Sequence, residues 1–165
     1  MPVERKEFRD AMARLCAAVN IITTDGPAGR AGFTASAMCS VTDSPPTLLV
    51  CMNKGVSSAE TFRQNGVLCV NTLAAEQQEL SGIFAGFTGV DGAARFESGG
   101  WSSLATGAPA LDGAMVAFDG RITDMVEKGT HLVVFAEIEA IRLGEGVDAA
   151  LLYFARDYRR VGVAA

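Results

Sequence analysis

The sequence predicts a mainly β fold, a closed or split β-barrel with helices at its edges. About seven short runs have the β-branched, apolar character of strands, whereas few segments show a helical period. These strands do not alternate with long helices, which disfavours a doubly wound parallel sheet. The chain has 165 residues, the size of one domain, so we expect residues 1–165 to form a single domain.

The N-terminal part predicts a helix followed by a hairpin. Phe8, Met12 and Leu15 recur at i, i+4 and i+7 among charged residues, which is typical of an amphipathic helix. A β-branched run and a second apolar run then flank the turn Asp-Gly-Pro-Ala-Gly, and this pattern favours two paired strands. The three elements are expected at residues 4–16, 18–24 and 33–41.

The rest of the chain alternates short strands with a few helices. Ser57 and Glu60 have the spacing of a capping box, which predicts a helix start, and Gly66 ends that helix. The segment 86–113 is rich in Gly, Ala and Ser and predicts a long functional loop. The other expected elements are strands at 48–52, 67–73, 115–122, 132–141 and 151–154, and helices at 57–65 and 76–84.

Composition excludes several classes of function. The net charge is −5, and an acidic surface repels phosphate backbones and anionic lipid, so we expect neither a nucleic-acid nor a membrane partner. No apolar run approaches the ~18 residues of a membrane span, and the charged N-terminus lacks the apolar core of a signal peptide. A single histidine excludes zinc sites with two histidines from one chain, and we expect no metal.

Four cysteines are spread along the chain without any Cys-x-x-Cys pair. Cys16, Cys39, Cys51 and Cys69 each stand among apolar neighbours. We therefore expect buried, reduced thiols in a cytoplasmic protein.

The glycines after the first strand do not form a dinucleotide-binding loop. Gly26, Gly29 and Gly32 have the spacing G-x-x-G-x-x-G, and the residues after them favour a strand rather than a helix. The sequence also contains no Walker A motif and no G-x-S-x-G elbow. The candidates that remain are polar side chains beside strands.

One such group lies along the predicted strand 33–41. Thr34, Ser36 and Ser40 fall on one face by the period of two. Hydroxyls on so apolar a strand need hydrogen-bond partners, which are either other groups of the chain or a bound ligand.

A second group lies where the next strand passes into a helix. Asn53, Lys54, Ser57 and Ser58 bring an amide, an ammonium and two hydroxyls to this point. The pattern predicts either an anion site or a plain helix cap with a solvated lysine.

Two further candidates lie near the C-terminus. His131 begins a strand after a polar turn, where it is either structural or a donor to a ligand. The final strand ends in basic and aromatic residues, among them Arg156 and Tyr158, which form either a solvated strand end or part of a site.

Taken together, these segments resemble the flavin reductase-like split-barrel family, the reductases of two-component flavin-dependent monooxygenases. The resemblance extends from about Phe8 to Val161. Within the family it is closest to the reductases of pyrimidine utilisation, and the 4-hydroxyphenylacetate monooxygenase reductases and the corrin reductases share the pattern. The matching blocks are FRDAMARLCAAVNIITTDGPAGRAGFTASAMCSVTDSPPTLLVCMN, VLCVNTLA, KGTHLVVFAEIEAI and LLYFARDYRRV.

The resemblance implies a split β-barrel that binds FMN, with FAD possible, and uses NADH or NADPH as co-substrate. It implies a cytoplasmic homodimer with flavin near the subunit interface, and a monooxygenase as transient partner. Hydride would pass from the nicotinamide to flavin N5, so the cofactor carries the chemistry and no acid–base pair is needed.

The resemblance also implies roles for individual residues. They fall into groups beside the isoalloxazine edge, the ribityl chain, the phosphate end and the nicotinamide. The group beside the isoalloxazine edge is Thr34, Ala35 and Ser36, and the group near the ribityl chain is Ser40 and Val41. The group at the phosphate end is Asn53, Lys54, Ser57 and Ser58. His131 and Tyr158 would lie near the nicotinamide, and Phe87 would be a further flavin contact.

Three functions remain open from the sequence. The first is a reductase that releases reduced flavin to a monooxygenase. The second is an enzyme that retains FMN and reduces a larger acceptor such as a corrinoid. The third is a flavin-binding protein without turnover.

Overall fold

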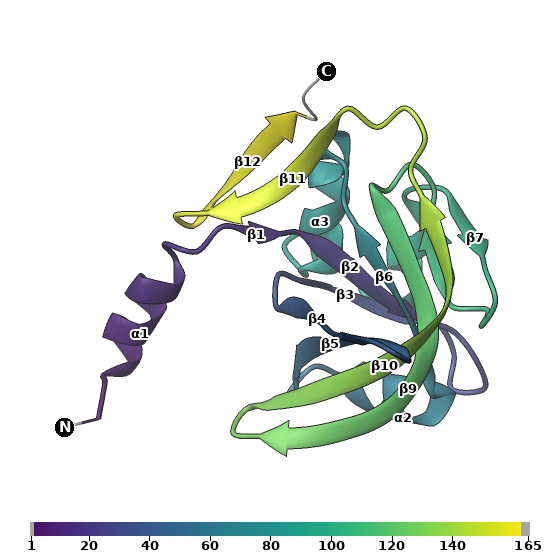
Figure 1. Ribbon diagram of the computed structural model, residues 1–165, viewed down its shortest axis with the longest axis horizontal. Coiled ribbons are helices and arrows are strands. Elements are labelled where there is room, and N and C mark those ends of the chain that lie inside the picture. Colours follow the sequence, from purple (N-terminus) through teal and green to yellow (C-terminus); the bar gives the residue numbers. More distant parts are fainter. Residues whose placement is uncertain (1, 163–165) are drawn as a thin grey trace.

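The computed structural model describes residues 2–162 and confirms the mainly β architecture (Figure 1). A seven-stranded antiparallel sheet has the order β3-β2-β6-β9-β10-β5-β4, and smaller sheets have the orders β1-β11-β12 and β7-β8. The strands are β1 (Ala17–Ala18), β2 (Asn20–Thr24), β3 (Ala31–Ala35), β4 (Met38–Asp43), β5 (Pro46–Asn53), β6 (Val67–Thr72), β7 (Trp101–Ser103), β8 (Pro109–Leu111), β9 (Val116–Lys128), β10 (His131–Leu143), β11 (Ala149–Phe154) and β12 (Asp157–Gly162). The helices are α1 (Arg5–Met12), α2 (Ala59–Asn65) and α3 (Gln78–Phe84), with 3₁₀ turns η1 (Ala75–Gln77) and η2 (Gly92–Glu97).

The two edges of the large sheet are neighbours in the sequence. β3 and β4 stand at opposite ends of the strand order, yet only Ser36 and Ala37 join them. The sheet must therefore curl until its edges approach each other, although β3 and β4 form no ladder with each other. The Ala37 carbonyl accepts a hydrogen bond of 2.9 Å from the Cys51 amide. This open seam is the split of a split barrel, as the sequence predicts.

The core follows the alternation of the strands. On β5 every second side chain is buried, as expected when one face of a strand packs inward. Phe62 of α2 closes one end of the barrel and meets Phe33 edge-on, with 5.5 Å between ring centroids. The largest fully buried side chains of this core are those of Ile22, Val50, Met52, Phe62, Leu68, Val70 and Val134.

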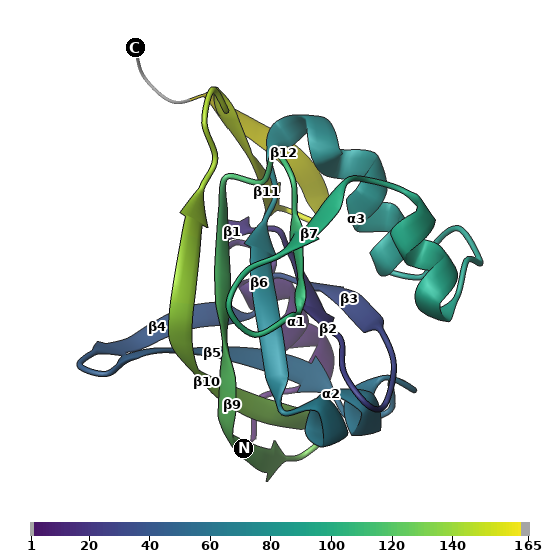
Figure 2. The ribbon, with the colours of Figure 1, turned by 90° about the vertical axis from the view of Figure 1, so that its right-hand side faces the viewer.

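The segment 86–113, predicted as one long loop, contains three short elements, so that prediction is wrong in part. It forms η2, β7 and β8, which lie beside α3 (Figure 2). Buried Asn71 binds β8 to the main sheet, because its Nδ2 donates to the Pro109 carbonyl at 3.3 Å and its Oδ1 accepts from the Leu111 amide at 2.7 Å. Strands of three residues that obtain their stability from such contacts leave no periodic signal in a glycine-rich sequence.

Two predicted elements need correction. The strand expected over 33–41 is two strands, so Thr34 and Ser36 do not share a strand face with Ser40. Helix α2 begins after Ser58, whose side chain makes no cap hydrogen bond, so the capping box at Ser57 is wrong. Gly66 does end this helix, with a φ of 67°.

The C-terminal residues form a hairpin rather than the end of a single strand. β12 pairs with β11 across a turn at Ala155 and Arg156, both of which have positive φ. Tyr158 therefore lies on an ordered strand, and Arg156 lies in the turn before it.

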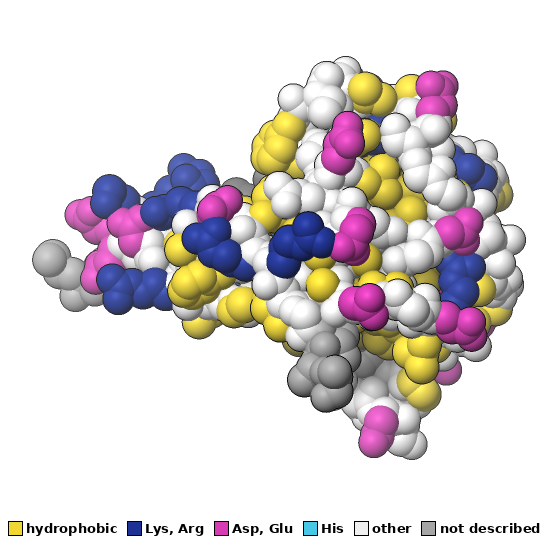
Figure 3. Space-filling model, turned by 90° about the horizontal axis from the view of Figure 1, so that it is seen from above, with side chains coloured by type: hydrophobic (Ala, Val, Ile, Leu, Met, Phe, Trp, Pro, Cys, Tyr) yellow, Lys and Arg dark blue, Asp and Glu magenta, His cyan; other side chains and the backbone are white. Residues whose placement is uncertain are grey.

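Helix α1 stands away from the main body (Figure 1). It ends at Met12, earlier than predicted, and none of its residues is buried. Phe8, Met12 and Leu15 are all exposed, so the predicted apolar stripe does not pack on this chain's own core. Seen from above, Lys, Arg, Asp and Glu side chains crowd this arm (Figure 3). Among residues 2–162 no helix has both the length and the apolar character needed to cross a membrane.

The cysteine prediction holds only in part. All four thiols are free, and Cys69 is buried. Cys51 is half-buried, whereas Cys16 and Cys39 are exposed, so the expectation of burial is wrong for these two. Cys16 follows the projecting helix and Cys39 lies on the edge strand β4, where apolar neighbours in the sequence do not imply a covering layer.

Candidate functional site

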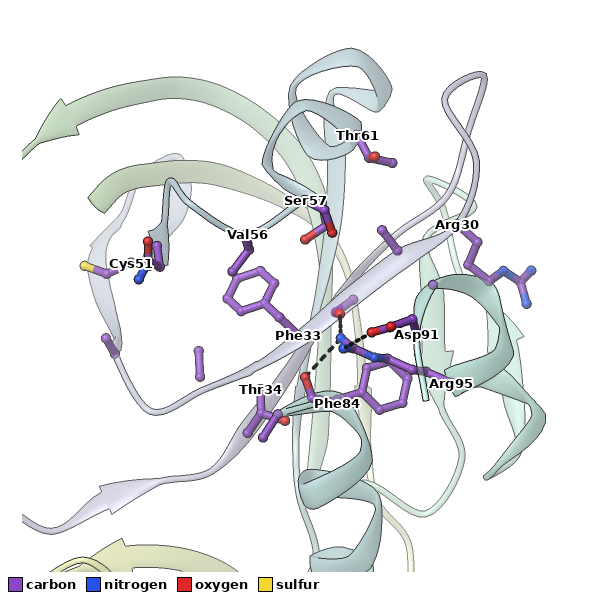
Figure 4. Close-up of a pocket in the computed structure, with 18 of the residues that line it drawn as sticks. Arg30, Phe33, Thr34, Cys51, Val56, Ser57, Thr61, Phe84, Asp91 and Arg95 are labelled. Atoms are coloured by element: carbon purple, nitrogen blue, oxygen red, sulfur yellow. Dashed lines mark hydrogen bonds and ion pairs between the residues drawn. The ribbon is translucent and has the colours of Figure 1, made fainter. Parts of the chain in front are cut away.

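A cavity of about 780 Å³ lies at the seam of the barrel (Figure 4). This volume falls in the range of sites for small molecules. β3 forms one wall, and the start of α2 and the end of β5 form another. Seven of the predicted site residues line it, namely Thr34, Ala35, Ser36, Asn53, Ser57, Ser58 and His131.

The free edge of β3 gives the cavity a backbone wall. β3 pairs only with β2, and the Gly32 carbonyl accepts from Nη1 of Arg95 at 3.1 Å, so this carbonyl points away from β2. In an antiparallel ladder backbone groups of alternate residues point to the same side, which directs the amide and carbonyl of Thr34 outward as well. This edge offers a donor and an acceptor to a planar ligand.

The hydroxyl of Thr34 has a partner in the protein. Its Oγ1 donates to the Ser81 carbonyl at 2.7 Å, which ties β3 to α3. Of the two partners that the sequence allowed, another group of the chain is the one found. Thr34 therefore offers the cavity its backbone rather than its hydroxyl.

Hydroxyls line the opposite wall. Ser57, Ser58 and Thr61 all face the cavity from the start of α2. Because the Ser58 side chain caps no helix amide, its hydroxyl remains available. Asn53 shapes the turn before them, where its Oδ1 accepts from the Gly55 amide at 2.9 Å. Thr61 lies within the predicted helix and gave no separate signal in the sequence.

The positively charged side chains that line the cavity are not the lysine that the sequence predicts. Lys54 does not line the cavity, and its ammonium pairs with Glu127. This hydrogen bond and the lysine's charge lower the pKa of Glu127. Arg30 and Arg95 line the cavity instead. Arg30 donates from Nε to Asp25 at 2.9 Å and lies over the Phe96 ring. Sequence reasoning missed Arg30, since it belongs to a turn without periodicity.

His131 is exposed at the rim of the cavity. It opens β10 directly across from Asn53 on β5. Its Nδ1 lies 2.9 Å from Oγ1 of Thr130, which restricts the ring. The seam therefore brings the sole histidine to the polar end of β5.

Another cavity, of about 390 Å³, also borders the segment Thr34–Ser36. Phe87, Tyr153 and Tyr158 line it. The Tyr158 hydroxyl lies 2.7 Å from Oγ of Ser81, so it is bonded within the chain. His131 and Tyr158, predicted for one nicotinamide site, thus line separate cavities of a single chain.

Ser40 and Val41 line neither cavity. Both are exposed on the edge strand β4. The break of the strand at Ser36–Ala37 carries them away from Thr34 and Ser36.

The larger cavity suits a flat heteroaromatic ligand with a polar tail. Apolar side chains of Phe33, Val56 and Phe84 border it, while hydroxyls, a backbone edge and the Arg30 guanidinium supply hydrogen-bond donors. No paired carboxylates line it; Asp91 is its one acidic residue among those described. Such a wall binds and orients a ligand that brings its own reactivity.

Comparison with known proteins agrees with this geometry. The family model described as flavin reductase like domain matches residues 12–162. A protein of Ancylobacter novellus named FMN reductase (NADH) RutF is 58% identical over 159 residues, which cover 96% of this chain and 86% of that protein.

Two solved structures show the same fold. A Haemophilus somnus protein classed as a flavin reductase superposes with a TM-score of 0.91 at 48% identity, covering 96% of this chain and 100% of the other. The styrene monooxygenase flavin reductase of Pseudomonas putida gives a TM-score of 0.82 at 25% identity, with 96% and 99% covered. From the fold, the cavity at the seam and these matches it follows that the chain belongs to the flavin reductase-like domain family.

Proposed function

We propose that this protein is a flavin reductase that oxidises NADH, reduces FMN and supplies the reduced flavin to a partner monooxygenase. The observation that carries the proposal is the cavity at the seam, with a backbone edge on one wall and hydroxyls on the other. Relatives named FMN reductase (NADH), which match 96% of this chain, support the choice of FMN and NADH.

The residues present fit FMN. The outward amide and carbonyl of Thr34 match the donor and acceptor edge of an isoalloxazine ring. Ser57, Ser58 and Thr61 would hold the phosphate end. When bound, the flavin would supply the hydride-accepting centre for a nicotinamide. The chain itself would orient the ring, and His131 at the rim would donate to the nicotinamide side.

We also propose that the protein acts as a homodimer. The outer face of the sheet is apolar, since Cys39, Leu49 and Phe135 follow one another across β4, β5 and β10, and Cys51 lies opposite Val133. This face reaches the cavity, because Cys51 borders both. A second copy packed there would cover the apolar face and narrow the mouth of the site.

Light scattering after gel filtration tests the dimer. Val41 is exposed on β4 beside this face, and Val41→Arg would place a charge in the interface. We expect twice the chain mass for the parent protein and a larger monomer fraction for the variant. A parent protein that runs as a monomer at all concentrations would refute the dimer.

Two further observations support the proposed partner and the proposed cellular location of the enzyme. The similarity to the styrene monooxygenase flavin reductase supports a monooxygenase as partner. Free thiols persist in reducing compartments, and the four free cysteines support a cytoplasmic location.

The function is tested by aerobic oxidation of NADH followed through nicotinamide absorbance. The reaction is run without flavin and with FMN, FAD or riboflavin added, and then repeated with NADPH. We expect oxidation that depends on added FMN. Yellow colour retained through gel filtration would instead favour an enzyme that keeps its FMN for another acceptor. No oxidation with any flavin would leave a flavin binder without turnover.

A further inference from the structure

The side chain of Arg95 connects three segments that border the cavity (Figure 4). Its Nε donates to the Val90 carbonyl at 2.9 Å, and its Nη1 donates to the carbonyls of Gly32 at 3.1 Å and Phe84 at 3.3 Å. These carbonyls belong to the loop 85–91, the free edge of β3 and the end of α3. One guanidinium thus fixes the relative positions of all three.

Arg95 has little capacity left for a ligand. An arginine side chain carries five N–H donors. Three are used by the carbonyls, and Nη2 lies 3.4 Å from Oδ1 of Asp91. The Arg95 side chain is 17% exposed, against 42% for Arg30. Its donors serve the chain itself, unlike those of an arginine that receives a phosphate.

The position of this charge indicates a geometric role. A half-buried guanidinium needs bonded donors, because a charge that is partly removed from water and left without partners is costly. The point it occupies is crowded, because a Cβ on Gly32 would lie 2.8 Å from Cε1 of Phe84. Phe84 in turn meets Phe96 edge-on at 5.0 Å. Small shifts here would move the edge of β3 against the loop.

We propose that Arg95 is a positioning residue for flavin binding. It sets the distance between the free edge of β3 and the loop 85–91, and with it the width of one end of the cavity, without holding the phosphate. This inference rests on the proposed function, since it assigns the cavity to flavin.

Binding of FMN and of riboflavin, each followed by quenching of flavin fluorescence, tests the role without turnover. For Arg95→Ala we expect both dissociation constants to rise about tenfold and by similar factors, as for the loss of charge-assisted hydrogen bonds. Added guanidinium chloride at millimolar concentration should restore part of the affinity, while sodium chloride should not. Arg121→Ala is the matched control, because Arg121 pairs with Glu139 on β10, outside the cavity.

The outcomes separate the alternatives. A loss of affinity for FMN alone would make Arg95 a phosphate ligand and overturn the inference, as would unchanged affinity for both flavins. Should Arg95→Ala fail to fold, Arg95→Lys serves in its place, with a smaller but again equal loss for both flavins. A parent protein that binds neither flavin would instead refute the proposed function.

Discussion

Lys54 and Glu127 form an ion pair between the turn after β5 and the end of β9, outside the cavity at the seam. The pair directs the ammonium away from the hydroxyls of Ser57 and Ser58, with which the sequence groups it. Under the proposed function, hydroxyls rather than this lysine would therefore hold the phosphate end of FMN.

The first prediction compares two substitutions on this turn. Ser57→Ala should raise the dissociation constant for FMN more than that for riboflavin, by about threefold to tenfold, because one hydrogen bond to a charged group is lost. Lys54→Ala should change the ratio between the two flavins less than Ser57→Ala does. Titration of each variant with both flavins measures the ratio of the dissociation constant for FMN to that for riboflavin. A larger change of this ratio in Lys54→Ala than in Ser57→Ala would show that Lys54 does bind the phosphate.

The second prediction concerns the crowded point on β3. Gly32→Ala places a Cβ 2.8 Å from the Phe84 ring and 3.0 Å from the Ile22 carbonyl. Since backbone cannot yield easily, we expect a loss of about 1–3 kcal/mol in the free energy of unfolding. Gly82→Ala in α3 is the control, because nothing lies within 4 Å of its Cβ, and it should stabilise by about 0.5–1 kcal/mol. Urea denaturation measures both, and equal stabilities would contradict the packing at Gly32.

The third prediction uses the thiols as reporters of the site. Cys16 is exposed and lies outside the proposed dimer face, so it should be alkylated first, while buried Cys69 should react only on unfolding. Burial raises the pKa of the Cys51 and Cys69 thiols, so fewer thiolates form and alkylation is slower at a given pH.

The alkylation of Cys51 reports whether a ligand occupies the cavity, because this residue borders it. Peptide mass spectrometry after brief alkylation should show protection of Cys51 by FMN, with no protection of Cys16. If FMN left the labelling of Cys51 unchanged, the flavin would bind elsewhere.

The fourth prediction concerns how α1 is attached. Asp10 accepts a hydrogen bond from Lys6 at 2.8 Å and pairs with Arg156 of the β11–β12 turn. These contacts lower the pKa of Asp10. A lowered pKa in the folded state means that the attachment is complete above the ordinary aspartate pKa and is lost as the pH falls through the lowered value.

Asp10→Asn should imitate the acid form at neutral pH. We expect faster tryptic cleavage after Arg14, since the helix is then held less firmly. Asp124→Asn, an exposed position on β9, should cleave at the parent rate. An unchanged rate for Asp10→Asn would show that the backbone hydrogen bond from Ala155 to Ala13 suffices.

The sequence predicts the strands of the barrel well and the small elements poorly. Runs such as 48–52 and 67–73 are recovered nearly at their bounds, because burial on one or both faces imposes an apolar pattern. β7 and β8 are missed, since their stability comes from tertiary contacts such as those of Asn71. The strand break at Ser36–Ala37 is also missed. The chain passes there from one edge strand of the sheet to the other, and the alternation of apolar and polar residues does not change at that point.

The site divides in the same way. The local sequence points to Ser57, Ser58 and His131, and all three line the cavity. Arg30 and Arg95 lie far apart in the sequence, and both border the cavity because η2 packs against β3. The orientation of Lys54 depends on Glu127, which is distant in the sequence, so no local pattern could reveal it.

The two-residue link between β3 and β4 also governs how the protein acquires its site. The walls of the cavity stand at opposite ends of the strand order, so a partly assembled sheet has no cavity. Flavin should then bind only the complete fold, and its binding energy should add to the global stability rather than to one local segment. During synthesis, the ability to bind flavin should arise late and all at once, after β10 has joined β9 to β5.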